Sequence, residues 1–132
     1  MNNVPTHLKH KPVIALDYEN LDEKAGAGDA KSLSIGVATW NKDYGKEDDL
    51  SYSAKIFRKV WDSGNWSPQS EELPLWRVID LASLVIAVIN GKPSGLGDQV
   101  VCPEKINSLR KFIDQNNALY QEKIDNLRKV IQ

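Results

Sequence analysis

One segment constrains the fold of this chain more than any other: from Leu73 to Ile89 almost every side chain is apolar. Its polar interior positions are Arg77, Asp80 and Ser83, which are spaced by three residues and form one narrow stripe along a helix. Aliphatic side chains occupy the remaining sides. Such a helix requires a sheet and other helices around it, so we expect it to be the core of the fold.

The ends of this helix can also be placed. Pro74 fits the first helical turn, and Gly91 after Asn90 is typical of a left-handed C-terminal cap. The sequence therefore predicts a helix over Pro74–Asn90. It is shorter than the roughly 20 apolar residues that cross a bilayer, and it contains two charges, so we expect no membrane association.

Upstream of the helix, three segments have the pattern of strands. Pro12–Leu16 is a short apolar run, and both Ser32–Trp40 and Leu50–Trp61 alternate with a period of two residues. The turn-rich residues between the last two segments predict a long antiparallel hairpin. Turn-forming residues between Trp61 and Trp66 predict another hairpin and a short fourth strand.

The C-terminal region, Pro103–Ile131, is amphipathic. Four apolar residues recur there every seven positions: Ile106, Ile113, Tyr120 and Leu127. Asn116 and Asn117 interrupt the pattern and leave open one long helix or two shorter ones. We expect the small core to leave part of this apolar seam uncovered, which predicts a homo-oligomer formed through the C-terminal helices.

These elements predict an α+β fold: a small antiparallel sheet of three or four strands packed on a buried helix, with C-terminal amphipathic helices. A length of 132 residues favours a single domain over 1–132, in which we interpret residues 1–11 as a flexible N-terminal tail. The lone Cys102 has no partner for an internal disulfide, and the tail lacks the apolar stretch of an export signal. We therefore expect a cytoplasmic protein and a buried or half-buried structural thiol.

Charge and motifs exclude several classes of function. Seventeen Lys and Arg against eighteen Asp and Glu give a net charge of -1, so no positive field attracts nucleic acid. Ala25–Ser32 ends in Lys-Ser like a phosphate loop, but alanines replace both required glycines. His7 and His10 lack further metal ligands, so we expect them to be solvent-exposed. Asp17 and Glu19 leave a divalent cation site open, although acidic loops are usually solvated. We expect no catalytic residue, metal or cofactor.

Polar residues are densest beside aromatic ones between Trp66 and Asp80. The candidate ligand- or partner-binding residues are Trp66, Gln69, Ser70, Glu71, Glu72, Trp76, Arg77 and Asp80. In a structural interpretation, the glutamates complement the helix dipole and Arg77 pairs with Asp80. In a functional interpretation, the segment lines a polar pocket at the N-terminus of the helix.

The stretch W-S-x-Q-S-E-E-L-P-L-x-R-x-x-D-L, over Trp66–Leu81, resembles the most recognisable part of a family of small uncharacterised bacterial proteins that carry a domain of unknown function. The resemblance covers Lys9 to about Ile89 and implies no activity. It is less clear in the C-terminal helical region.

Two hypotheses of function follow. The first is a non-enzymatic cytosolic binding or protein-interaction domain, because we find no nucleophile–base pair, metal quartet or phosphate loop in the sequence and the C-terminal region is amphipathic. The alternative is a small-molecule-binding protein or enzyme with a polar pocket around Trp66–Asp80.

Overall fold

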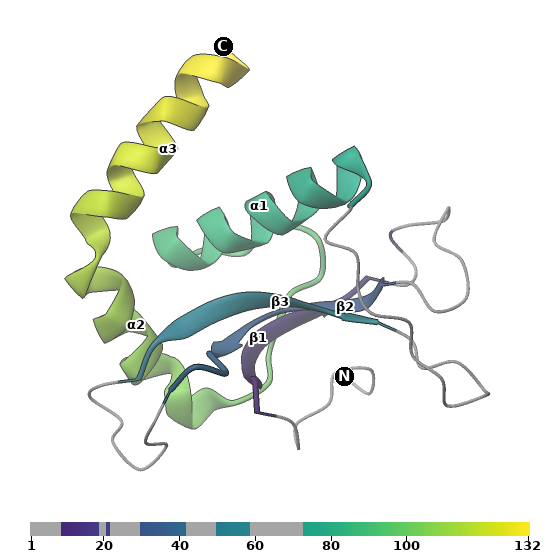
Figure 1. Cartoon of the computed structure of the whole chain (residues 1–132), viewed down its shortest axis with the longest axis vertical. Helices are drawn as coiled ribbons and strands as arrows, with labels where there is room; N and C mark the ends of the chain where they lie inside the picture. Colours follow the sequence, from purple (N-terminus) through teal and green to yellow (C-terminus); the bar gives the residue numbers. More distant parts are fainter. Residues whose placement is uncertain (1–8, 19–20, 22–29, 42–49, 59–72) are drawn as a thin grey trace.

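The computed structural model describes residues 9–18, 21, 30–41, 50–58 and 73–132. In chain order its elements are β1 (Lys11–Asp17), β2 (Ala30–Val37), β3 (Tyr52–Arg58), α1 (Leu75–Asn90), β4 (Gln99–Val100), a 3-10 turn (Pro103–Lys105), α2 (Ile106–Gln115) and α3 (Asn117–Ile131). The strands form one antiparallel sheet in the order β3-β2-β1-β4. α1 lies across one face of this sheet, α2 stands near one end of it, and α3 extends away from it (Figure 1). The expected α+β fold is confirmed.

The alternation in β2 confirms the two faces expected for this strand. Leu33, Ile35 and Val37 belong to the main core, while Ser32 and Ser34 are on the opposite face and are fully buried as well. Both faces of β2 are therefore covered.

β2 ends at Val37 rather than at the expected Trp40. The side-chain amide of Asn41 donates to the carbonyls of Ala38 (2.8 Å) and Ser51 (3.0 Å), and its oxygen accepts from the Ser51 N–H at 2.8 Å. Because this side chain replaces ladder hydrogen bonds at the end of the hairpin, the chain turns there and Trp40 is left exposed.

The main core joins the sheet to α1 and α2. Leu84 and Val88 of α1 and Leu109 and Ile113 of α2 pack with the inner residues of β1 and β2. The predicted helix is confirmed over Leu75–Asn90, and Gly91 caps it with φ 68°. The expectation that α1 is covered on all sides is wrong, because its N-terminal half has one face in the core and the opposite face in solvent.

The fourth strand, β4, lies between α1 and the C-terminal helices, where the sequence pattern predicts no strand. β4 pairs with β1, with Ile14 opposite Val100, and the Val13 carbonyl accepts from the Val101 N–H at 2.7 Å. Its two residues are too few to show a period in the sequence. The hairpin predicted between Trp61 and Trp66 lies outside the described residues.

The C-terminal region is two helices, which settles the alternative left open by the sequence. Asn116 separates them, and its side-chain amide donates to the Phe112 carbonyl at 2.8 Å. In the apolar seam, Ile113 is 5% exposed and packs in the core, while Ile106, Tyr120 and Leu127 are half-buried. The seam is thus largely used within the chain, and self-association through it stays a prediction.

The N-terminal boundary differs from the expected tail over residues 1–11. β1 already begins at Lys11, and His10 is only 1% exposed, so the expectation that His10 is solvent-exposed is wrong. The reason is a set of contacts with distant strands, described below. Cys102 is half-buried, as expected, and burial together with Glu104 raises the pKa of its thiol.

A substitution at Gly36 can test the close contact between the backbones of β1 and β2. A Cβ atom at this position would lie 2.2 Å from the Lys11 carbonyl oxygen, where β1 and β2 pair irregularly near Pro12. Because the obstacle is backbone, we expect Gly36→Ala to destabilise the fold by about 2 kcal/mol or more in urea unfolding. Ala54→Ser, at an exposed position of β3, is the control and should change stability by less than about 0.5 kcal/mol. Equal stabilities of the two variants would contradict this packing.

Candidate functional site

Arg77, on the first turns of α1, points into the protein. It is 1% exposed, and its guanidinium carbon lies 5.7 Å from the centroid of the Tyr18 ring, a cation–π arrangement. The Tyr18 hydroxyl donates to Oδ2 of Asp80 at 2.7 Å. Tyr18 directly follows β1 and is fully buried, so both charged residues of α1 contact a side chain at the end of this strand.

This cluster accounts for two of the eight candidate residues. Trp76 is next to it in the sequence but is 46% exposed. Trp66, Gln69, Ser70, Glu71 and Glu72 lie outside the described residues. The Arg77–Asp80 ion pair stays a prediction, since the described contacts place both side chains on Tyr18.

The inward position of the two charged residues places apolar residues of α1 outside. Leu75 is 81% exposed and Ile79 is 67% exposed, whereas Ala82 and Ile86 are half-buried. These four residues lie on one side of the helix, opposite Leu84. We call Leu75, Ile79, Ala82 and Ile86 the outer stripe; it carries no charge.

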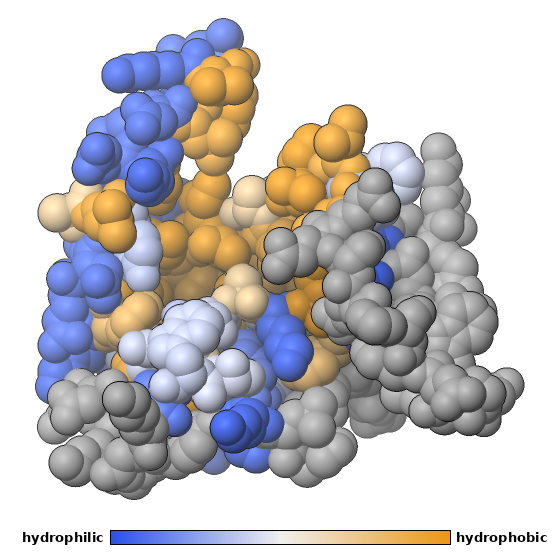
Figure 2. Space-filling view, in the orientation of Figure 1, coloured by the Kyte–Doolittle hydropathy of each residue, from blue (hydrophilic) through white to orange (hydrophobic). Residues whose placement is uncertain are grey.

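A groove runs beside the outer stripe. It has a volume of about 110 Å³ and is lined by β3, by the flank of α1 and by α2 and α3, with Val85, Ile89, Phe112 and Tyr120 among its walls. Figure 2 shows apolar side chains on α1 and on the side of α3 that faces it, with a hollow between them. The groove adjoins the Ala82 and Ile86 end of the outer stripe, because Val85 and Ile89 are next to these residues on the helix, while Leu75 and Ile79 lie toward the other end of α1.

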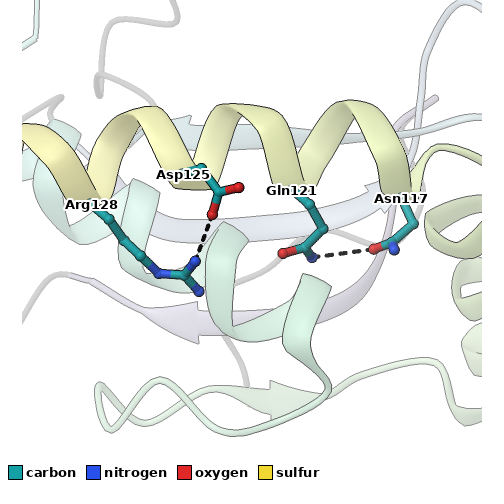
Figure 3. A network of polar contacts seen from close by, with 4 residues as sticks. All are labelled: Asn117, Gln121, Asp125 and Arg128. Atoms are coloured by element: carbon teal, nitrogen blue, oxygen red, sulfur yellow. Dashed lines mark hydrogen bonds and ion pairs between the residues drawn. The ribbon is translucent and has the colours of Figure 1, made fainter.

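Polar contacts mark another side of α3. Gln121 donates to Asn117 at 3.2 Å, and Arg128 pairs with Asp125 at 2.6 Å, all on the exposed surface of the helix (Figure 3). Ile124, by contrast, is only 7% exposed. α3 is therefore amphipathic in the structure, with a solvated side and an apolar side.

A second cavity, of about 360 Å³, also lies at the C-terminal end of α1 and shares Val88 with the groove. It is formed by Ile14, Val100 and Leu109 with Lys92 and Arg110 at its polar part. Arg110 donates to the carbonyls of Val88 and Ile89, so it binds the last turn of α1 rather than projecting into open space. Neither cavity is lined by Trp76, Arg77 or Asp80.

Sequence reasoning missed a histidine–serine contact on the face of the sheet opposite α1. Nε2 of His10 lies 2.9 Å from Oγ of Ser34, Nδ1 lies 3.4 Å from Oγ of Ser53, and the ring meets Phe57 edge-on. Burial, and secondarily Lys55, lowers the pKa of His10 to about 4. Because His10 and Ser34 are closed off from solvent and a base works best near neutral pH, we interpret this pair as structural.

No sequence signal identifies this contact, because residues 24 positions apart meet only when the sheet forms. For metal ligands, the described part of the chain holds no group of three or more His, Cys, Asp or Glu side chains. Of the acidic residues considered for a cation, Asp17 ends β1, and Glu19 lies outside the described residues.

The comparison with protein families decides the classification. The model of a family of unknown function, DUF6530, matches residues 1–91. The chain belongs to this family. The match ends at Gly91, the cap of α1, so it contains the Tyr18–Arg77–Asp80 cluster and the outer stripe but not β4, α2 or α3.

The other comparisons found no match among curated proteins or solved structures. Among the described helices, none combines the length and the apolar character that a membrane crossing requires.

Arg77 should matter to stability far more than an exposed arginine. Arg77→Ala removes a buried cation that lies over the Tyr18 ring, so we expect a loss of about 3 kcal/mol or more in urea unfolding. Arg128→Ala is the control, since the Arg128–Asp125 pair is 61% and 60% exposed and should contribute less than about 1 kcal/mol. Equal losses would show that Arg77 is not held as described. Adding Asp80→Ala and the double variant measures the predicted Arg77–Asp80 coupling.

His10 makes stability depend on pH. Its pKa is about 4 in the folded protein against 6.5 when unperturbed, so the unfolded chain binds a proton that the folded one excludes. The stabilisation is complete above pH 6.5 and is lost as the pH falls from 6.5 to 4, by up to about 1.4 kcal/mol per pH unit. Unfolding of His10→Gln should depend less steeply on pH over this range than unfolding of the natural chain. Identical pH profiles for the two proteins would refute this role. His7, which was also expected to be solvent-exposed, lies outside the described residues.

Proposed function

We propose that this protein is a non-enzymatic, cytosolic protein-interaction domain that binds a protein partner through the outer stripe of α1. The observation that carries the proposal is the order of side chains on this helix. Arg77 is 1% exposed while Leu75 and Ile79 are 81% and 67% exposed, the reverse of an ordinary surface helix.

The energetic argument rests on the apolar surface left in water. Burying a leucine or isoleucine side chain stabilises by about 1.5–3 kcal/mol, a gain that Leu75 and Ile79 do not make in the isolated chain. Single exposed apolar residues are common, but here they follow one another along one helix beside an apolar groove. A partner that covers the stripe recovers this free energy on association.

The groove adds a pocket to the interaction surface, which the outer stripe by itself lacks. Interfaces depend on a few apolar anchors that enter pockets, and the walls around Phe112 and Tyr120 offer such a pocket next to the stripe. The small-molecule alternative around Trp66–Asp80 has less support, since Arg77 is packed against Tyr18 and neither described cavity reaches it.

The proposal requires the exposed residues of the outer stripe to be unused by the fold itself. We expect Leu75→Gln with Ile79→Gln to change the free energy of unfolding by less than about 0.5 kcal/mol, measured at a concentration that keeps the chain monomeric. Leu84→Ala, on the inner side of the same helix, is the control and should cost about 2–5 kcal/mol.

The double variant should also lose the binding of an apolar fluorescent dye that the natural chain shows. A loss of stability comparable to that of Leu84→Ala would mean that the stripe belongs to the core, and the proposed function would then fall.

A further inference from the structure

The outer stripe has the spacing of a helix that pairs with another helix. Positions 75, 79, 82 and 86 are separated by four, three and four residues, which is the repeat of an apolar seam between two helices. These separations are the same in both directions along α1. A two-fold axis through the middle of the stripe therefore places Ile79 opposite Ala82 of a second copy, and Leu75 opposite its Ile86.

Ala82 makes the two stripes complementary in shape in this antiparallel arrangement. Its short side chain leaves room on the stripe, and Ile79 of the second copy would fill that room at both central contacts. A parallel arrangement would instead place isoleucine against isoleucine and leave a gap between two alanines. Alternating large and small side chains across the contact favours the antiparallel pair.

The lack of charge on the outer stripe determines which kind of helix can pair with it. Arg77 and Asp80 are the charged residues of α1, and both face inward, so the outer stripe offers no opposite charge to a charged partner. A charged residue placed on the stripe would be buried without a counter-ion. A helix with the same neutral stripe meets no such cost, and across a two-fold axis a second copy presents the same surface.

The size of the surface requires more than α1. The helix has 16 residues and is about 24 Å long, whereas a stable interface buries about 800 Å² on each partner. Additional apolar area is available on the side of α3 that faces α1 in Figure 2. There Tyr120 and Leu127 are half-buried, and Ile131 is 74% exposed.

We infer that the partner is a second copy of this chain, joined through the outer stripes of two antiparallel α1 helices around a two-fold axis, with the α3 helices at the flanks. This inference rests on the proposed function and names its partner. It moves the expected self-association from the C-terminal seam to α1, because Ile113 of that seam is already packed in the core.

The experiment is sedimentation equilibrium of the full chain at increasing concentration. The mass should rise from 14.8 kDa towards twice that value by about 100 µM. Ile79→Asp should raise the dissociation constant at least about thirtyfold, because it buries an unpaired carboxylate in the interface. Ile79→Gln should weaken the dimer in the same direction if the aspartate variant is not folded by circular dichroism.

Leu119→Asp is the matched control. Leu119 is also an exposed apolar helix residue, 51% exposed, but it lies on a side of α3 away from Ile124, so its dimer should persist. A natural chain that stays monomeric at about 100 µM would overturn the second copy as partner. So would a dimer that Ile79→Asp and Ile79→Gln leave intact. Neither result touches the proposed function, which the stability of the Leu75 and Ile79 double variant tests separately.

Discussion

The contact of Arg77 with Tyr18 sets the orientation of α1, and much of the surface follows from it. A buried guanidinium needs a polarisable or charged neighbour, and Arg77 has the ring of Tyr18, whose hydroxyl in turn donates to Asp80 on the side of α1 that faces the sheet. Once α1 is turned to satisfy them, Leu75 and Ile79 must point to solvent, because they are on the opposite side of the helix. Turning the helix to bury these residues would place both charges outside and break the Tyr18 hydrogen bond.

The elements of the fold were predictable, but the rotation of α1 was not. Period-two alternation located β2 and β3, a short apolar run located β1, and Pro74 and Gly91 marked the ends of α1, because these signals are local. Hydrophobic periodicity gave no direction for α1, since nearly all its sides are apolar. The sequence predicted that Arg77 pairs with Asp80 on the same helix, and the contribution of Tyr18 from another element was not visible.

Contacts between distant residues explain the other differences. His10 is buried because Ser34 and Ser53 come from two strands that reach it only in the assembled sheet. β4 exists because two residues pair with the edge of β1, which no propensity over so short a stretch reveals. For the candidate site, the sequence identified Arg77 and Asp80 as unusual, but the apolar stripe they leave outside became visible only with their burial.

The contact between Arg110 and the end of α1 bears on where this domain can be divided. Arg110 of α2 donates hydrogen bonds to the carbonyls of Val88 and Ile89. Gly91 leaves room for this arginine, since a Cβ at position 91 would lie 2.9 Å from its Nη1. Leu109 and Ile113 complete the same core as β1 and β2. The family match ends at residue 91, between the last turn of α1 and the helix α2 that packs against it. The boundary of sequence similarity is therefore not a boundary of cooperative folding, and a fragment cut there would leave the last turn of α1 without its cation and the core without its far wall.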